Sequence, residues 1–191
     1  MNVILPVAAA VCFLAVFPTE ESAPAKQSTE GKYPFEAILV LTPEQCSEES
    51  KKGGLVGGKE KYRMGELLCP TAESTVKQVF EKYTRVETFP ENGSTPGKVV
   101  LTPKFVDLEV AKTFGKRKMV LLVEWTARDE SGKVFWVQTV EGNAQEKTGN
   151  IVTSGSHRRK MLEAIRKDLT DKSVQAMRQS PQFQKLAKKT S

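Results

Sequence analysis

Apolar and polar residues alternate most regularly in the second half of the chain. Every second residue from Met119 to Ala127 is apolar, and in Val134 to Val140 the residues Val134, Trp136 and Val140 face one way. A period of two is typical of a strand with one buried face. Ser131-Gly132 lies between the two segments and supplies a turn, since glycine accepts the positive φ of a tight hairpin. These segments predict a β-hairpin.

Three further segments predict strands. Glu36 to Thr42 is a short apolar run of the kind found in central strands. Lys98 to Ala111 alternates, but Pro103 has no N–H to donate, so we expect this strand at a sheet edge or at a bulge. Tyr62 to Leu68 follows a glycine-rich, charged loop and suggests a short edge strand.

Helical spacing occurs twice. Thr71 is a candidate N-cap, and the apolar residues after it recur at intervals of three and four; they are Val76, Val79, Phe80 and Tyr83. A longer helix is expected from Ser154-Gly155-Ser156 up to an interruption at Pro181. Its apolar stripe consists of Met161, Leu162, Ile165, Leu169 and Met177.

This order of elements predicts an α+β fold, an antiparallel (mixed) sheet of four to five strands with two helices packed on one face. Residues 36–180 would form a single α+β domain. Residues 26–35 are polar without periodicity and predict a flexible tether, and residues 181–191 predict a frayed basic tail.

The first 25 residues have the pattern of an export signal. Val3 to Phe17 is uncharged and apolar, which is too short for a bilayer span and suits the apolar part of a signal peptide. Ala23-Pro24-Ala25 offers a cleavage site with small residues. Cys12 is a weak candidate for lipid attachment, because Val11 stands where a lipoprotein signal has a small residue. We therefore expect a periplasmic or outer-membrane-associated protein.

Removal of this segment leaves two cysteines, Cys46 and Cys69. An even pair in an exported chain indicates a disulfide, and two separate buried thiols are the alternative.

Positive charge is concentrated near the end of the chain. The formal net charge is +6, and the residues from Arg158 onward contribute ten Lys/Arg against three Asp/Glu. Such a segment suits an anionic lipid, a nucleic acid, an acidic protein or simply a solvated helix face. The candidate binding residues are Arg158, Arg159, Lys160, Arg166 and Lys167.

The residue inventory argues against catalysis and against a cofactor. His157 is the only histidine and no C-x-x-C is present, so the common zinc motifs are excluded. Gly53 to Lys59 matches a phosphate-loop spacing, but Glu60 follows where Ser or Thr would bind magnesium. Trp125 and Trp136 suit either an aromatic binding platform or a pair in the core.

The segment Val120 to Gly142 resembles small bacterial envelope proteins, in which a strand ends in D-x-x-G-K and the next begins with an aromatic residue. The matching residues are Asp129, Gly132, Lys133 and Trp136. The proteins concerned are outer-membrane lipoproteins of the lipopolysaccharide-assembly type, the curli-secretion lipoprotein and the amino-terminal domain of the Tol periplasmic protein. The resemblance implies a role in binding or assembly without chemistry of its own.

We therefore expect a non-enzymatic cell-envelope protein with an envelope protein as partner, bound through the sheet face, a sheet edge or the basic helix. The alternative is a basic domain that binds anionic lipid, polysaccharide or nucleic acid through the C-terminal helix, with peripheral membrane association. Nucleic acid is the least favoured of these ligands, and a hydrolase with an unrecognised site is a distant third.

Overall fold

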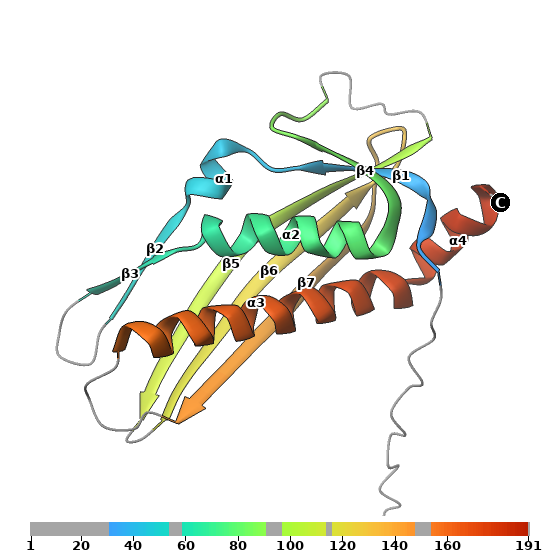
Figure 1. Ribbon diagram of the computed structural model, residues 1–191. Helices are drawn as coiled ribbons and strands as arrows, with labels where there is room; N and C mark the ends of the chain where they lie inside the picture. Colours follow the sequence, from blue (N-terminus) through green and yellow to red (C-terminus); the bar gives the residue numbers. More distant parts are fainter. Residues whose placement is uncertain (1–30, 54–58, 91–96, 114–115, 148–153, 191) are drawn as a thin grey trace, which may run out of the picture.

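The computed structural model describes residues 31–53, 59–90, 97–113, 116–147 and 154–190. A five-stranded sheet in the order β4-β1-β5-β6-β7 forms its centre, and a two-stranded sheet, β2-β3, projects beside it (Figure 1). The strands are β1 Tyr33–Val40, β2 Glu49–Gly53, β3 Lys59–Arg63, β4 Phe80–Val86, β5 Lys98–Thr113, β6 Lys116–Arg128 and β7 Val134–Lys147. The helices are α1 Pro43–Ser47, α2 Gly65–Val79, α3 Ser154–Gln179 and α4 Pro181–Thr190.

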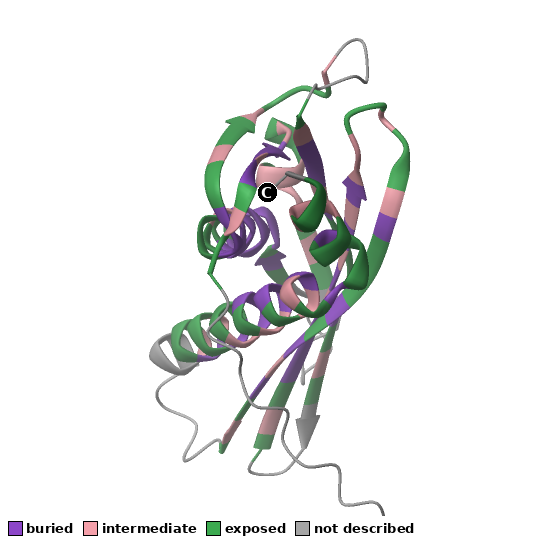
Figure 2. Ribbon diagram, turned by 90° about the vertical axis from the view of Figure 1, so that its right-hand side faces the viewer, coloured by how far each residue is buried: buried purple, intermediate pink, exposed green. Residues whose placement is uncertain are grey.

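The predicted fold class is confirmed. β1 pairs in parallel with β4 and with β5, whereas β5, β6 and β7 are antiparallel, so the sheet is mixed. The two long helices, α2 and α3, lie on the same face of this sheet (Figure 1). Figure 2 shows that their buried residues face the sheet and their exposed residues face away from it. The main core therefore lies between the sheet and these two helices.

The hairpin of β6 and β7 forms as predicted. Trp125 is fully buried and Trp136 is 7% exposed, so both belong to the core and neither forms an open aromatic platform. They are diagonal neighbours, because Trp125 pairs with Gln138 and Trp136 pairs with Ala127. The Trp125 indole N–H donates a 3.1 Å hydrogen bond to the Ser173 hydroxyl, which ties the hairpin to α3.

The sequence predicted Pro103 at a sheet edge or at a bulge, and the structure shows both features. β1 pairs with β5 only as far as Leu101, so Pro103 faces no strand on that side. The register of β5 against β6 also shifts between Phe105 and Asp107, which is a bulge. Gln45 from α1 donates a 2.8 Å hydrogen bond to the Pro103 carbonyl, so a side chain partly replaces the missing strand.

The expected strand at Tyr62 to Leu68 is wrong beyond Arg63, because α2 already begins at Gly65. Thr71 is therefore not the N-cap: it is buried inside the helix, and its hydroxyl donates to the Leu67 carbonyl at 2.6 Å. Pro70 lies inside the helix, near its start. Gly65 permits this early start, since a Cβ there would lie 2.0 Å from the Cys46 carbonyl oxygen.

The helix also ends earlier than expected, and Phe80 and Tyr83 belong to strand β4. Val76, Val79, Phe80 and Tyr83 do have helical spacing, but only the first two lie in α2. β4 pairs in parallel with β1, with Tyr83 opposite Ala37. Pairing with the interior strand β1 has therefore overridden the local pattern.

The expected frayed tail is wrong as well, because Pro181–Thr190 forms helix α4. Phe183 is fully buried and packs against an aromatic cluster that comprises Tyr33, Phe80, Phe135 and Trp136. The Ser180 hydroxyl accepts a 3.4 Å hydrogen bond from the Phe183 N–H at the start of this helix. Burial of the Phe183 ring thus stabilises a segment that composition alone predicted to be frayed.

The same cluster shortens the expected tether, since Tyr33 and Phe35 already belong to β1. The Tyr33 hydroxyl donates to the carbonyls of Met177 and Arg178, at 3.2 and 3.3 Å, in the last turn of α3. The expected signal peptide lies outside the described residues. In the part of the chain that the structure describes, no helix is long and apolar enough to cross a membrane.

The predicted disulfide is confirmed. Cys46 in α1 is bonded to Cys69 in α2, with their Cα atoms 5.7 Å apart. Cys69 lies within the helix rather than before it, as the earlier start of α2 requires. The bond fastens α1, which leads into the β2-β3 hairpin, to the layer of helices.

Candidate functional site

Two hollows follow one another along the line where α3 meets β3 and α2. The first has a volume of about 350 Å³ and is lined by Lys61, Tyr62, Arg63, Glu66, Leu67, Arg158 and Leu162. The second has a volume of about 360 Å³ and is lined by Pro70, Ser74, Gln78, Arg166, Lys167, Thr170 and Asp171. The lining residues of α2 and of α3 continue in sequence from one hollow to the next. We call these two hollows together the α2–α3 seam.

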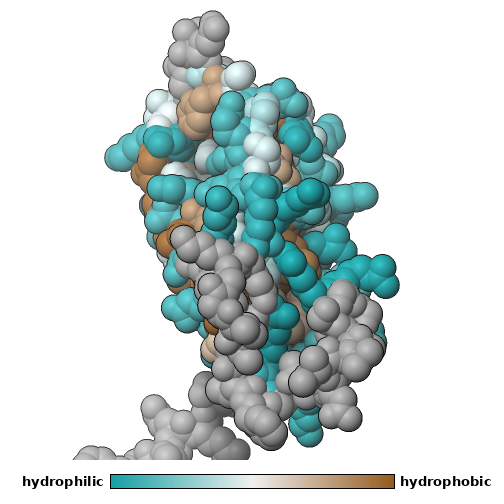
Figure 3. All heavy atoms as spheres, turned by 90° about the vertical axis from the view of Figure 1, so that its left-hand side faces the viewer, coloured by the Kyte–Doolittle hydropathy of each residue, from teal (hydrophilic) through white to brown (hydrophobic). Residues whose placement is uncertain are grey.

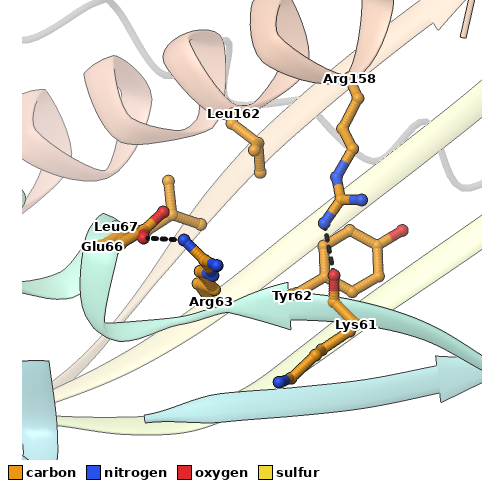
Figure 4. A pocket seen from close by; sticks show the side chains of 7 residues that line it. All are labelled: Lys61, Tyr62, Arg63, Glu66, Leu67, Arg158 and Leu162. Atoms are coloured by element: carbon orange, nitrogen blue, oxygen red, sulfur yellow. Dashed lines mark hydrogen bonds and ion pairs between the residues drawn. The ribbon is translucent and has the colours of Figure 1, made fainter. Parts of the chain in front are cut away.

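Arg158 reaches from the first turns of α3 across the first hollow (Figure 4). Its guanidinium carbon lies 4.6 Å from the centre of the Tyr62 ring, which is a cation–π contact. One guanidinium nitrogen donates a 2.5 Å hydrogen bond to the Lys61 carbonyl. Arg158 therefore holds the start of α3 against β3, and it covers a ring that is only 2% exposed.

Carboxylates compensate the other cations of the first hollow. Arg63 pairs with Glu66 at 2.8 Å, and this carboxylate raises the pKa of Arg63. The Lys61 ammonium points away from the hollow (Figure 4) and lies 2.6 Å from Glu49, where it lowers the pKa of that carboxyl group. Among the described residues, no carboxylate lies within ion-pair distance of Arg158.

The second hollow repeats this arrangement. Lys167 pairs with Asp171 at 2.6 Å, and Asp171 raises the pKa of Lys167. Arg166 is exposed, and it too lacks a carboxylate partner within the described part of the chain. The facing side of the hollow carries a hydroxyl and an amide, from Ser74 and Gln78 of α2. Each hollow therefore combines one ion pair with one arginine that is not neutralised in this way.

The structure divides the five predicted binding residues into two groups. Arg158, Arg166 and Lys167 line the seam. Arg159 and Lys160 are exposed and line neither hollow. Sequence reasoning missed the residues that β3 contributes, Lys61, Tyr62 and Arg63; an aromatic residue between two cations was the available signal. The side of the molecule that carries β2 and β3 is mostly hydrophilic, with smaller hydrophobic patches (Figure 3).

One sheet edge is partly occupied by α3. The Asn143 N–H of β7 donates a 2.7 Å hydrogen bond to the Asp168 carboxylate. The Lys172 ammonium donates a 3.0 Å hydrogen bond to the Glu141 carbonyl, and it also pairs with Asp168 at 2.8 Å. These side chains take the place that a neighbouring strand would have. The middle of β7 is thus unsuited to accept a strand from a partner.

The sheet face opposite the helices has a small apolar cluster, formed by Ile38, Val40 and Val100, but all three residues are buried. Val106 and Val137 are 48% and 51% exposed on other strands. Scattered apolar residues are normal on a protein surface. The described part of this face therefore offers less than the seam does for specific binding.

The described residues contain no group of three or more His, Cys, Asp and Glu side chains that could hold a metal ion. Asp129, in the β6–β7 turn, accepts hydrogen bonds from the Ser131 hydroxyl and from the backbone N–H groups of Ser131 and Lys133. These bonds, that of the Ser131 hydroxyl above all, lower the pKa of Asp129. Its carboxylate shapes the turn and is poorly suited to donate a proton near neutral pH.

No protein-family model and no curated protein matches the sequence. Solved structures that are similar include a minor lipoprotein from Acinetobacter baumannii, with 10% identity and a TM-score of 0.41 over 83% of this chain and 93% of that one. A lipoprotein from Neisseria meningitidis has 11% identity and a TM-score of 0.33, covering 72% of this chain and 99% of that one. A putative lipoprotein from Caulobacter crescentus has 11% identity and a TM-score of 0.33, with coverage of 65% and 80%. The structural neighbours thus include bacterial lipoproteins at low identity.

Proposed function

We propose that this chain is a non-enzymatic protein of the cell envelope that binds a partner protein through the α2–α3 seam. The observation that carries the proposal is the pair of hollows, each with an arginine, Arg158 or Arg166, that no described carboxylate neutralises. Arginine is enriched where proteins recognise one another, because its planar guanidinium forms several directed hydrogen bonds. The seam lies between regular elements, so its side chains are held in place before a partner arrives.

Two observations support a location outside the cytoplasm. The Cys46–Cys69 disulfide suits an oxidising compartment, since such bonds are rare where thiols are kept reduced. The apolar run Val3 to Phe17 has the length of a signal-peptide core.

A second candidate function is binding to an anionic membrane surface. Arg159 and Lys160 are exposed and line neither hollow. A flat anionic surface, such as a membrane, can reach cations of this kind without entering a hollow. Binding to a bilayer would therefore depend on Arg159 and Lys160 as well as on Arg166.

Site-specific photocrosslinking in the native host tests the proposed function. A photoreactive amino acid in place of Lys167, at the rim of the second hollow, should give a discrete protein adduct. The matched control is the same substitution at Lys104, which is exposed on β5. An adduct from position 167 that is absent from position 104 supports the proposal. Equal adducts from both positions, or none from position 167, would contradict it.

A further inference from the structure

We infer that the ligand of the α2–α3 seam is an extended peptide segment with two acidic side chains four positions apart. The inference rests on the proposed function and names the chemistry of the partner. It follows from the length of the seam, from the spacing of its two arginines and from the side chains between them.

The length of the seam suits a short segment of polypeptide. Its lining residues on α3 run from Arg158 to Asp171. Thirteen helical steps span about 20 Å at a rise of about 1.5 Å per residue. An extended chain rises about 3.3 Å per residue, so about six residues would fill this length.

The spacing of the arginines sets the positions of the acidic residues. Arg158 and Arg166 are eight positions apart on α3, which corresponds to about 12 Å along the axis and about 80° around it. In an extended chain, residues i and i+4 point to the same side and lie about 13 Å apart. Two carboxylates at this spacing would each meet one guanidinium, and charge-assisted hydrogen bonds of this type are the stronger ones.

The side chains between the arginines favour a peptide with an apolar central residue. Leu162 is half-buried and Leu67 is 7% exposed, and both line the first hollow on the side toward the second. Farther along, Ser74 and Gln78 offer a hydroxyl and an amide that can bond to a peptide backbone. An apolar residue midway between the two acidic ones would face the leucines.

The same geometry argues against the two other anionic ligands. Single-stranded nucleic acid binds by stacking bases on aromatic rings, but Arg158 already covers Tyr62, which is 2% exposed. A bilayer would contact the exposed Arg159 and Lys160, which line neither hollow, as readily as the exposed Arg166, so it would not select the side chains of the hollows.

The test uses a labelled hexapeptide, Glu-Ala-Leu-Ala-Glu-Ala, and the disulfide-bonded protein as isolated from its host. Binding is followed by NMR titration, which detects weak complexes. Arg166→Glu should weaken binding about fivefold, because reversing an exposed charge removes one ion pair and adds a repulsion. Arg159→Glu is the matched control, with the same change of charge on the same helix, and it should change affinity by less than about twofold.

Two further probes separate the possible outcomes. A peptide with both glutamates adjacent, Ala-Glu-Glu-Leu-Ala-Ala, should bind about threefold more weakly than the spaced peptide. Vesicles that contain phosphatidylglycerol report the membrane alternative. If Arg159→Glu weakens peptide binding as much as Arg166→Glu does, or if the two peptides bind equally, the inference fails. It also fails if only the vesicles bind. A partner adduct from position 167 would then still support the proposed function, whereas loss of that adduct would remove both.

Discussion

Arg158 and Arg159 are adjacent in sequence and differ in role, because successive helical residues point about 100° apart. The sequence placed Arg158, Arg159 and Lys160 together among the candidate binding residues. The structure separates Arg158 from the other two, since its guanidinium packs on Tyr62 and donates to the Lys61 carbonyl.

We expect Arg158→Glu to lower the free energy of unfolding by about 1–2 kcal/mol, through loss of the cation–π contact and of one hydrogen bond. Urea denaturation measures this change. Arg159→Glu is the control, and it should stay within about 0.5 kcal/mol of the wild type. Equal effects of the two substitutions would show that Arg158 makes no stabilising contact in solution.

The Asp129 carboxylate should make the stability of the protein depend on pH. Because hydrogen bonds lower its pKa in the folded state, its carboxylate contributes stability that is fully present above the unfolded-state pKa, about 4. That contribution is lost as the pH falls through the lower, folded-state pKa. Asp129→Ala should therefore lower the free energy of unfolding by about 1 kcal/mol at pH 7.

The difference between wild type and Asp129→Ala should remain constant above about pH 5 and shrink below about pH 4. Urea denaturation at a series of pH values measures it. Ser131→Ala is a second variant, which removes only the hydroxyl donor and should have a smaller effect of the same sign. A difference that grows in acid would show that Asp129 does not have a lowered pKa.

At the scale of elements, the sequence predicted the helices and strands whose pattern depends on burying one face against one neighbour. The alternation in β6 and β7 and the stripe of α3 each reflect burial against a single neighbour. The starts of α2 and β4 depend instead on distant partners. Gly65 must fit against the Cys46 backbone, and β4 needs β1 beside it, and neither partner is visible in a local window.

The disulfide should stabilise the protein by restricting the unfolded state. The bond closes a loop between residues 23 positions apart, which corresponds to about 3 kcal/mol in the chain-entropy model. The double variant Cys46→Ala/Cys69→Ala should be less stable by this amount in urea denaturation. Reduced wild type is the control, and it should resemble the variant. Equal stability of the oxidised wild type and the variant would mean that native contacts alone hold α1 on α2.

The packing of helix α4 on the core can be tested by a substitution of Phe183. Phe183 is fully buried, so Phe183→Ala should lower the free energy of unfolding by about 3–5 kcal/mol. Lys185→Ala, two positions away and exposed, is the control and should have little effect. A negligible effect of Phe183→Ala in urea denaturation would instead support the frayed tail that composition alone suggested.

At the scale of the whole molecule, the candidate site was only half visible in the sequence. The cations of α3 stand out by their density, and three of the five predicted residues do line the seam. The opposite wall is built by β3 and α2, roughly a hundred positions earlier, as the hydrogen bond from Arg158 to Lys61 illustrates. Only the tertiary fold places the two walls together, so no local pattern could have paired them.

Export is the prediction that belongs to the whole molecule. The protein isolated from its native host should lack about the first 25 residues, since signal peptides are removed on export. Intact-mass spectrometry measures this directly, and alkylation without reductant should leave Cys46 and Cys69 unlabelled. Recovery of an intact amino terminus from the cytoplasm would contradict the prediction, and the disulfide serves as an independent control of the compartment.

The contact of α3 with β7 also bears on how many copies of the protein act together. An uncovered strand edge accepts any compatible strand, including one from an identical molecule, and each addition creates a new edge. Asp168 and Lys172 fill this position on Asn143 and Glu141 from within the same chain. Copies are thereby hindered from stacking through the middle of β7 into an open-ended fibril.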